Sequence, residues 1–325
     1  MNPSTTISRE ATLSLSETDN RSAVELLRAL DALNYDFIAP TPASHARVLE
    51  REGRAIGSNL MDLLGWSLPC RRDVVPDAVV SALEEAGFLE RQQNGLIAAR
   101  VRVSRVFGNL FIHSRFPTTQ QDAVFLGPDS HRFGDYILRN IDGLPGNTRV
   151  LDYGAGAGTG GITAATRLPG ARLTLADINP TALALAAANA SHARVEHDLV
   201  QVQSPADFDL RYDLIVMHPP FMIDPDRRAY RDGGDLFGGR LSLDWALEGA
   251  RLLGPGGRLV MHTGVSIVGG RDVVRDALVE ALPTAEYVID YHLLDPDIFG
   301  DELSSEAYAE VDRIAAVGLR IDRIA

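Results

Sequence analysis

A strand that runs into a glycine-rich turn constrains the fold of this chain more than any other feature. Residues 150–158 read VLDYGAGAG, an apolar strand followed by glycine at every second position. Glycine has no Cβ and tolerates positive φ, so such a turn lets the backbone approach a ligand closely. Residues 162–168 can then form a helix whose N-terminus faces the same ligand. The segment predicts a strand–turn–helix unit that binds a nucleotide-like molecule.

The next predicted strand, residues 173–176, ends on Asp177, nineteen residues after Gly158. A carboxylate at this place in a βαβ unit is positioned to accept both hydroxyls of a ribose. The unit is therefore expected to hold a ligand that contains adenosine. Gly156, Gly158 and Gly161 also satisfy the dinucleotide fingerprint, so an NAD site and a purely structural glycine turn are the alternatives.

Three details favour S-adenosylmethionine (SAM) over a dinucleotide. Asp152 lies two residues before the first glycine of the turn, where its charge would repel a pyrophosphate but suits an ammonium and a sulfonium. A later strand, residues 212–217, ends in the sequence HPPF (218–221), which dinucleotide enzymes do not need. Asp198 follows a short apolar run, residues 193–195, and is placed to accept a hydrogen bond from the adenine amino group.

Together these segments resemble the class I SAM-dependent methyltransferases over about residues 122–325. VLDYGAGAG resembles their motif I, LADINP the acidic end of the second strand, and HPPF their motif IV. The resemblance implies a Rossmann-like α/β fold with a seven-stranded sheet whose last strand is antiparallel. It implies SAM as the cofactor, held by Ser130, Arg132, Asp152, Tyr153, Gly154, Gly156, Gly158, Asp177, Ile178, Asp198 and His218. It implies catalytic roles for His218, Pro219, Phe221 and Tyr230.

The first position of HPPF departs from the family pattern. In N-methyltransferases with Asn-Pro-Pro-Phe/Tyr, the Asn oxygen and the proline carbonyl accept hydrogens from the target amine. Here His218 replaces the Asn. A neutral imidazole accepts one hydrogen bond and can take a proton near neutral pH. His218 is thus expected to be a general base or an acceptor, the alternative being that it only packs beside Met217. Glutamine and adenine become doubtful substrates.

The segment after HPPF, residues 224–234, is dense in charge and bounded by glycines. It is expected over the carboxyl ends of the strands, where open α/β sheets bind ligands. Candidates there for selecting a carboxylate-bearing substrate are Arg228, Tyr230, Arg231 and Asp232, with a solvated loop as the alternative for each. Two further histidines are candidates for the edge of the pocket, namely His262 and His292.

Composition narrows the function. All 31 cationic residues are arginine, which excludes P-loop and pyridoxal chemistry because both need a lysine. The net charge of −13 lowers the expectation of a nucleic-acid substrate. The single cysteine, Cys70, cannot build a disulfide framework or a zinc site, so no metal is expected. No apolar run approaches the roughly 20 residues of a membrane span, and the polar N-terminus is unlike a signal peptide. A cytoplasmic location follows.

The sequence suggests three parts. Residues 1–20 are expected to be disordered or loosely attached. Residues 21–118 read as several helices and a hairpin, a mainly helical, winged-helix-like domain that serves as a lid, a substrate platform or a dimer surface. Residues 119–325 are expected to form the SAM-binding domain, since strands and helices alternate along them.

The leading hypothesis is a methyltransferase that acts on the amine of a small metabolite, as in secondary metabolism, or on a carrier-bound or protein amine. The partner is then a small molecule, with nucleic acid unlikely, no membrane, and a dimer as one possible state. One alternative is a SAM-consuming cyclase, in which the α-amine attacks the γ-carbon and methylthioadenosine leaves, giving azetidine-2-carboxylate. The other is a non-catalytic SAM sensor whose wing binds DNA.

Overall fold

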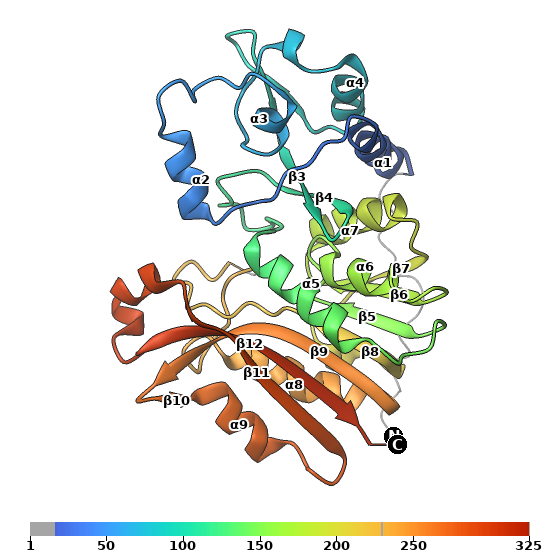
Figure 1. Ribbon diagram of the computed structural model, residues 1–325, viewed down its shortest axis with the longest axis vertical. Coiled ribbons are helices and arrows are strands. Elements are labelled where there is room, and N and C mark those ends of the chain that lie inside the picture. Colours follow the sequence, from blue (N-terminus) through green and yellow to red (C-terminus); the bar gives the residue numbers. More distant parts are fainter. Residues whose placement is uncertain (1–16, 229, 325) are drawn as a thin grey trace, which may run out of the picture.

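The computed structural model describes residues 17–228 and 230–324. In that part of the chain, one large sheet carries seven strands in the order β11-β12-β9-β8-β5-β6-β7 (Figure 1). An eighth, short strand, β10, pairs with the end of β9. The strands are β5 (Arg149–Tyr153), β6 (Arg172–Asp177), β7 (His197–Gln201), β8 (Tyr212–Met217), β9 (Leu253–Val268), β10 (Arg271–Asp272), β11 (Tyr287–Ile298) and β12 (Arg313–Arg323).

The pairing directions match the predicted fold class. β5 pairs in parallel with β6 and β8, β6 with β7, and β8 with β9. β12 runs antiparallel to both of its neighbours, β9 and β11. The prediction of a Rossmann-like sheet with an antiparallel last strand is therefore confirmed. β10 extends the sheet beyond the seven expected strands.

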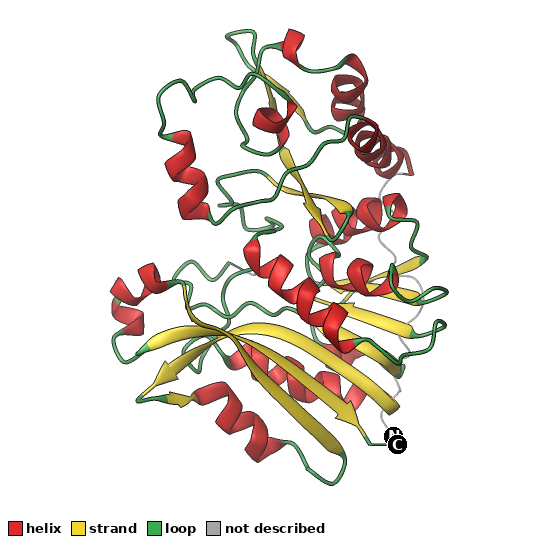
Figure 2. Cartoon of the chain, in the orientation of Figure 1, coloured by secondary structure: helices red, strands yellow, loops and turns green. Residues whose placement is uncertain are grey.

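Helices cover both faces of the sheet (Figure 2). The helices after the N-terminal part are α5 (Pro128–Asn140), α6 (Thr159–Ala165), α7 (Pro180–His192), α8 (Arg240–Leu252) and α9 (Val273–Ala281). Alternate strand residues point to opposite faces. Val150 packs with α5, α6 and α7 in one core cluster, while Leu151 packs with α8 and α9 in another. Buried apolar side chains on both faces explain why the central strands read as continuous hydrophobic runs.

The N-terminal part combines helices with two hairpins, β1–β2 and β3–β4. Its elements are α1 (Glu17–Ala32), α2 (Pro42–Leu49), α3 (Leu60–Leu64), α4 (Asp77–Glu85), β1 (Leu89–Arg91), β2 (Ile97–Ala99), β3 (Val101–Val106) and β4 (Asn109–Ser114). One hydrophobic cluster runs from α1 through these hairpins into α7 and the sheet. The shared core fixes this part against the larger one. The three-part division and the winged-helix likeness stay predictions, and residues 1–16 lie outside the described chain.

A buried asparagine joins the two parts and the glycine turn. Asn189 of α7 is fully buried. Its Oδ1 accepts from the Ile112 backbone N–H of β4 at 2.8 Å, and its Nδ2 donates to the Ile112 carbonyl at 3.1 Å and the Ala157 carbonyl at 2.9 Å. A single side chain thus satisfies three buried backbone groups, two in the N-terminal part and one in the turn.

Replacing Asn189 with leucine is expected to lower the free energy of unfolding by at least about 3 kcal/mol. Each buried backbone group left without a partner costs about 1–3 kcal/mol. Urea unfolding followed by circular dichroism measures the loss. Asn94→Ala is the control, since Asn94 is exposed and accepts only from the Leu96 N–H, and it should cost about 1 kcal/mol or less. Equal losses in the two variants would contradict the bridging role.

One strand lies later in the sequence than expected. The expected role of Asp198 depended on the short apolar run 193–195 before it, but Ala193 is the C-cap of α7 and Arg194 has a φ of +59°. These residues complete the turn at the end of the helix, and β7 begins only at His197.

No helix among the described residues is long and apolar enough to cross a membrane.

Candidate active site

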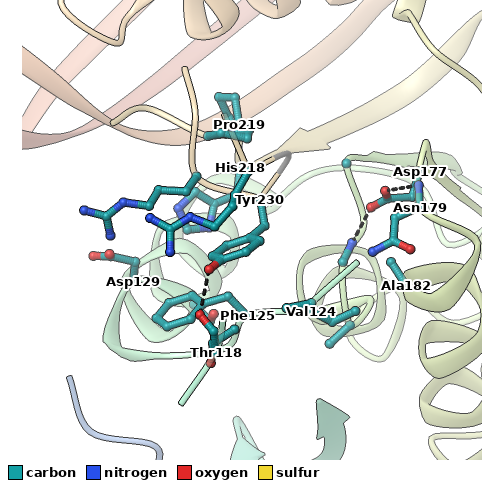
Figure 3. A pocket seen from close by; sticks show the side chains of 18 of the residues that line it. Thr118, Val124, Phe125, Asp129, Asp177, Asn179, Ala182, His218, Pro219 and Tyr230 are labelled. Carbon is teal, nitrogen blue, oxygen red and sulfur yellow. Dashed lines mark hydrogen bonds between the residues drawn. The ribbon is translucent and has the colours of Figure 1, made fainter. Parts of the chain in front are cut away.

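A cavity of about 620 Å³ opens at the carboxyl ends of β5, β6 and β8 (Figure 3). Most of its walls come from four places: the glycine turn, the end of β6, the HPPF segment with the loop after it, and residues 116–130 at the junction of the two parts. A volume of roughly 300–1,000 Å³ is usual for sites that bind small molecules and cofactors. The cavity lies where open α/β sheets bind ligands.

Three glycines of the turn have left-handed backbones, and each is needed for a different reason. Gly154 has φ +71°, and a Cβ there would lie 2.6 Å from the Trp245 ring. Gly158, with φ +79°, caps α6, and a Cβ would press on Ile162 at 2.9 Å. Gly156, with φ +54°, lines the cavity and has no atom within 4 Å of a Cβ position. Its bare backbone faces the space that a ligand would fill.

Asp177, at the end of β6, faces the cavity (Figure 3). Its Oδ2 accepts from the Gly156 N–H at 2.9 Å and its Oδ1 from the Asn179 N–H at 2.8 Å. Burial raises the pKa of Asp177, and these backbone donors oppose the rise. Each oxygen keeps a lone pair for a further donor. Ile178, which is 49% exposed, gives an apolar surface beside the carboxylate.

Asp152 lines the floor of the cavity and is 1% exposed. Its Oδ2 accepts from the Gly161 N–H of α6 at 2.7 Å. Burial raises the pKa of Asp152 to about 8, the Gly161 bond opposes this, and the charge of Asp177 adds to it. The carboxyl is therefore largely protonated at neutral pH in the absence of a cation, and a bound cation would favour its ionised form.

Two histidines meet at the HPPF segment. His218 follows β8 and lines the cavity, and His262 of β9 is fully buried behind it. Nδ1 of His262 lies 3.3 Å from Nε2 of His218, while Nε2 of His262 is buried without a partner. Burial lowers the pKa of both rings, so both are neutral at pH 7. Because both rings are neutral, one of the two facing nitrogens donates to the other, and His218 offers an acceptor to the cavity when its own Nε2 is the donor.

The rest of the HPPF segment also lines the cavity. Pro219 and Pro220 face it, and Phe221 stacks near His218 with ring centroids 6.2 Å apart. The Phe221 ring lies against β9 at Gly264, where a Cβ would come within 2.2 Å of the ring. Only glycine leaves room for the aromatic ring at that position. Tyr153 also lines the cavity and packs edge-on against Trp245 at 4.6 Å.

The charged loop after HPPF closes the cavity toward the N-terminal part. The Tyr230 hydroxyl donates to the Thr118 carbonyl at 2.7 Å (Figure 3). Arg228 makes two hydrogen bonds to the buried carboxylate of Asp224, and this lowers the pKa of Asp224. Arg231 pairs with Glu302 at 2.6 Å. Both arginines line the cavity but are neutralised by these partners, which argues against their predicted role in selecting a carboxylate.

Several predicted site residues lie elsewhere. Arg132 pairs with Asp129 at 2.8 Å and Asp295 at 3.0 Å and does not line the cavity. Its guanidinium is therefore occupied by two carboxylates of the protein. Because it lies outside the cavity, it is not placed to hold the methionine carboxylate as predicted. Ser130 does line the cavity, and Asp232 lies in its wall. His292 is an exposed residue that pairs with Asp290 and lies outside the cavity.

The predicted adenine contact at Asp198 is wrong. Asp198 is exposed in the middle of β7, opposite Thr174, because β7 begins later than the apolar run suggested. The residue level with Asp177 is Gln201, and Gln203 beyond it lines the cavity. Gln203 could have been predicted as a polar residue just after β7. That prediction needed the correct end of the strand, which the sequence did not show. The sequence analysis also missed Trp245 and Arg102, whose positions depend on distant packing.

Comparisons with known proteins give a family. Residues 134–230 match the family model "Methyltransferase small domain". The chain is 27% identical over 233 residues to release factor glutamine methyltransferase of Deinococcus radiodurans, covering 69% of this chain and 79% of that one. The same enzyme of Koribacter versatilis is 33% identical over 39% of this chain and 50% of its own length. Ribosomal RNA small subunit methyltransferase C of Pseudomonas putida is 33% identical over 26% and 25%.

Two solved structures are similar to this chain at low identity. Trm5b of Pyrococcus abyssi is 13% identical, with a TM-score of 0.47 over 71% of this chain and 58% of that one. TrmN of Thermus thermophilus is 19% identical, with a TM-score of 0.40 over 76% and 66%.

These matches confirm the resemblance at the level of the class, and with it the enzyme class and SAM as the cofactor. They also correct one expectation. The sequence analysis held a nucleic-acid partner unlikely and expected a small-molecule one, but the relatives are named for a release factor and for ribosomal RNA. Net charge misled here, because an overall acidic balance says nothing about the substrate that a local surface binds.

Proposed function

We propose that this chain, a class I SAM-dependent methyltransferase, methylates a side-chain nitrogen of a protein. The observation that carries the proposal is the neutral His218, held by His262 at the HPPF segment, in one cavity with the glycine turn and Asp177. A protein acceptor is supported by the relative that matches 69% of the chain, which is named for a release factor glutamine.

The donor set of the cavity fits SAM. Asp177 keeps lone pairs for the ribose hydroxyls, Gly156 leaves room above the turn, and Ile178 and Gln203 suit the adenine. Asp152 and Ser130 also line the cavity and are the candidates to hold the methionine part. Bound SAM supplies a methyl group on a cationic sulfur.

The protein's own residues then orient the acceptor nitrogen. His218 accepts a hydrogen from the nitrogen through its free ring atom, and the Pro219 carbonyl is a second acceptor. These bonds aim the lone pair along the transfer axis, while Phe221 and Tyr230 exclude water. Such positioning can lower a barrier by about 7–11 kcal/mol. His218 can take the proton that the nitrogen loses, since its ring is neutral at pH 7.

A labelling experiment tests the acceptor class. The enzyme is incubated with SAM tritiated in its methyl group and with a cell extract from a strain that lacks the gene. We expect the label in acid-precipitable material that protease releases and nuclease does not. A His218→Ala enzyme is the control for background transfer. Label that nuclease releases would assign an RNA acceptor and overturn the proposal.

SAM binding is expected to release a proton from Asp152. A cationic ligand favours the carboxylate, so below the raised pKa of about 8 binding must displace the proton. The affinity for SAM should therefore rise with pH between about 6 and 7.5, by up to tenfold per pH unit. Calorimetry in buffers of different ionisation enthalpy counts the protons.

Two controls isolate the effect. Asp152→Asn should remove the proton release, and adenosine, which has neither cation, should cause none with the unaltered enzyme. Equal proton release by SAM and adenosine would contradict the role of Asp152.

A further inference from the structure

An unpaired arginine lies buried in the wall of the cavity. Arg102 of β3 is 2% exposed and lines the cavity. Its Nε donates to the Ser114 carbonyl at 3.1 Å. Among residues 17–228 and 230–324, no other hydrogen bond and no ion pair of its guanidinium is found. Its terminal nitrogens are therefore without a protein acceptor in that part of the chain.

Three partly buried arginines of this molecule face carboxylates. Arg54 pairs with Asp62 at 2.7 Å, Arg228 with Asp224, and Arg258 with Asp322 at 2.6 Å. Arg102 is more deeply buried than any of these. An unpaired buried charge is strongly destabilising, so it is seldom kept without a ligand that neutralises it.

The surroundings of Arg102 offer a single positive charge. His45 and His113 are fully buried nearby. Burial lowers the pKa of His45 to about 4 and that of His113 well below its ordinary value, and the charge of Arg102 lowers both further. Both rings are neutral, and Arg54, whose charge also lowers the pKa of His45, is paired with Asp62, so the unpaired charge near these rings is that of the Arg102 guanidinium. A planar guanidinium binds one carboxylate through two parallel hydrogen bonds, whereas a phosphate usually gathers several cations.

The position of Arg102 points to the acceptor rather than to SAM. Its partner Ser114 ends β4, and the chain then continues into Phe116, Pro117 and Thr118, which line the same cavity. Thr118 accepts the hydrogen bond of Tyr230 from the loop after HPPF. Arg102 is therefore linked, through Ser114 and residues 116–118, to the loop after HPPF that carries Tyr230.

We propose that Arg102 binds a carboxylate carried by the acceptor near its methylated nitrogen. The inference rests on the proposed function, because it assigns the specificity of the same site. It replaces the prediction that Arg228 and Arg231 recognise such a group. An acidic side chain next to the target, or a chain terminus, supplies this chemistry on a protein.

Acetate is the probe for the test, so no acceptor and no methyl transfer are needed. The enzyme is saturated with adenosylhomocysteine, which fills the cofactor's own carboxylate position, and acetate replaces chloride at constant ionic strength. The melting temperature is followed for the unaltered chain, Arg102→Met, Arg102→Lys and the control Arg100→Met, whose arginine is exposed.

We expect acetate to stabilise the unaltered chain and Arg100→Met saturably. In Arg102→Met the half-maximal concentration should rise at least tenfold, and in Arg102→Lys less, because lysine keeps the charge without the planar fork. Without acetate, Arg102→Met should melt at the same or a higher temperature, since the unpaired charge is gone. Affinity for SAM should stay within twofold.

Three results would overturn the inference. A lower melting temperature of Arg102→Met with an unchanged acetate response would make Arg102 structural. If Arg102→Met bound SAM tenfold more weakly but bound methylthioadenosine, which has no carboxylate, as before, Arg102 would be assigned to the SAM carboxylate. Stabilisation of the unaltered chain by phosphate at tenfold lower concentration than acetate would assign a phosphate-bearing acceptor. A failure of protein methylation leaves the acetate result unaffected, so the two proposals are tested separately.

Discussion

Asp177→Ala is expected to weaken SAM binding at least about a hundredfold. In our account the Asp177 carboxylate accepts both ribose hydroxyls, and each hydrogen bond to a charged acceptor is worth about 1.5–3 kcal/mol. The same carboxylate also holds the turn through the Gly156 N–H at 2.9 Å. Its loss frees the turn as well as the ribose, so the effect should exceed that of the two bonds alone. Calorimetric titration with SAM measures the change.

Asp198→Ala is the matched control for that experiment. Asp198 is an acidic residue in the strand next to Asp177, but it is exposed and lies outside the cavity. Its removal changes the net charge by the same amount and should leave SAM affinity within about twofold. A hundredfold loss in Asp198→Ala, or undiminished binding in Asp177→Ala, would show that the ribose is held elsewhere.

The second large effect is expected at His218. His218→Ala should lower kcat about a hundredfold or more, the range of an acid–base contribution, with SAM affinity unchanged. His218→Asn, which restores the usual family residue, should recover part of the rate because the amide oxygen is again an acceptor. Methyl transfer to extract protein at saturating SAM measures kcat.

The pH profile separates a chemical role of His218 from a structural one. Protonation removes the ring's acceptor, and burial lowers the pKa of His218 below its ordinary value. Transfer should therefore stay constant through neutral pH and fall only in acid, below about pH 6.5. The acid limb should disappear in His218→Asn. An identical limb in both enzymes would assign it to another group.

His262 acts on His218 rather than on the substrate. It is fully buried and does not line the cavity, and its contact is the 3.3 Å approach to His218. The sequence analysis placed His262 at the edge of the pocket, and the structure places it behind that edge as a positioning residue. The pair explains how a histidine can be held where the family usually has an asparagine.

Local patterns made the fold and half of the site predictable. The strand before Gly154, the acidic end at Asp177 and the HPPF segment each combine a strand end with a residue type that only a close approach or a specific contact requires. Each of these patterns spans only a few consecutive residues, so each can be recognised in the sequence without knowledge of the fold. The alternation of strands and helices then specified the sheet.

The remaining site residues depend on contacts between distant segments. Asp198 was misplaced because the apolar run 193–195 is the turn that follows α7, and β7 begins only at His197. Arg132 was expected to be free, but Asp295, 163 residues away, pairs with it. Arg102 is notable only because no carboxylate from the described chain reaches it, and that absence follows from packing. Sequence periodicity cannot reveal which charges find partners.

Product analysis after incubation with SAM distinguishes methyl transfer to a protein from cyclisation of SAM. Mass spectrometry of reactions with SAM alone, and with SAM plus extract protein, separates adenosylhomocysteine from methylthioadenosine. We expect adenosylhomocysteine only when protein is present, with a gain of one methyl mass on that protein. Methylthioadenosine formed from SAM alone would show that the cavity cyclises its ligand instead, and no consumption under either condition would contradict an enzyme of this kind.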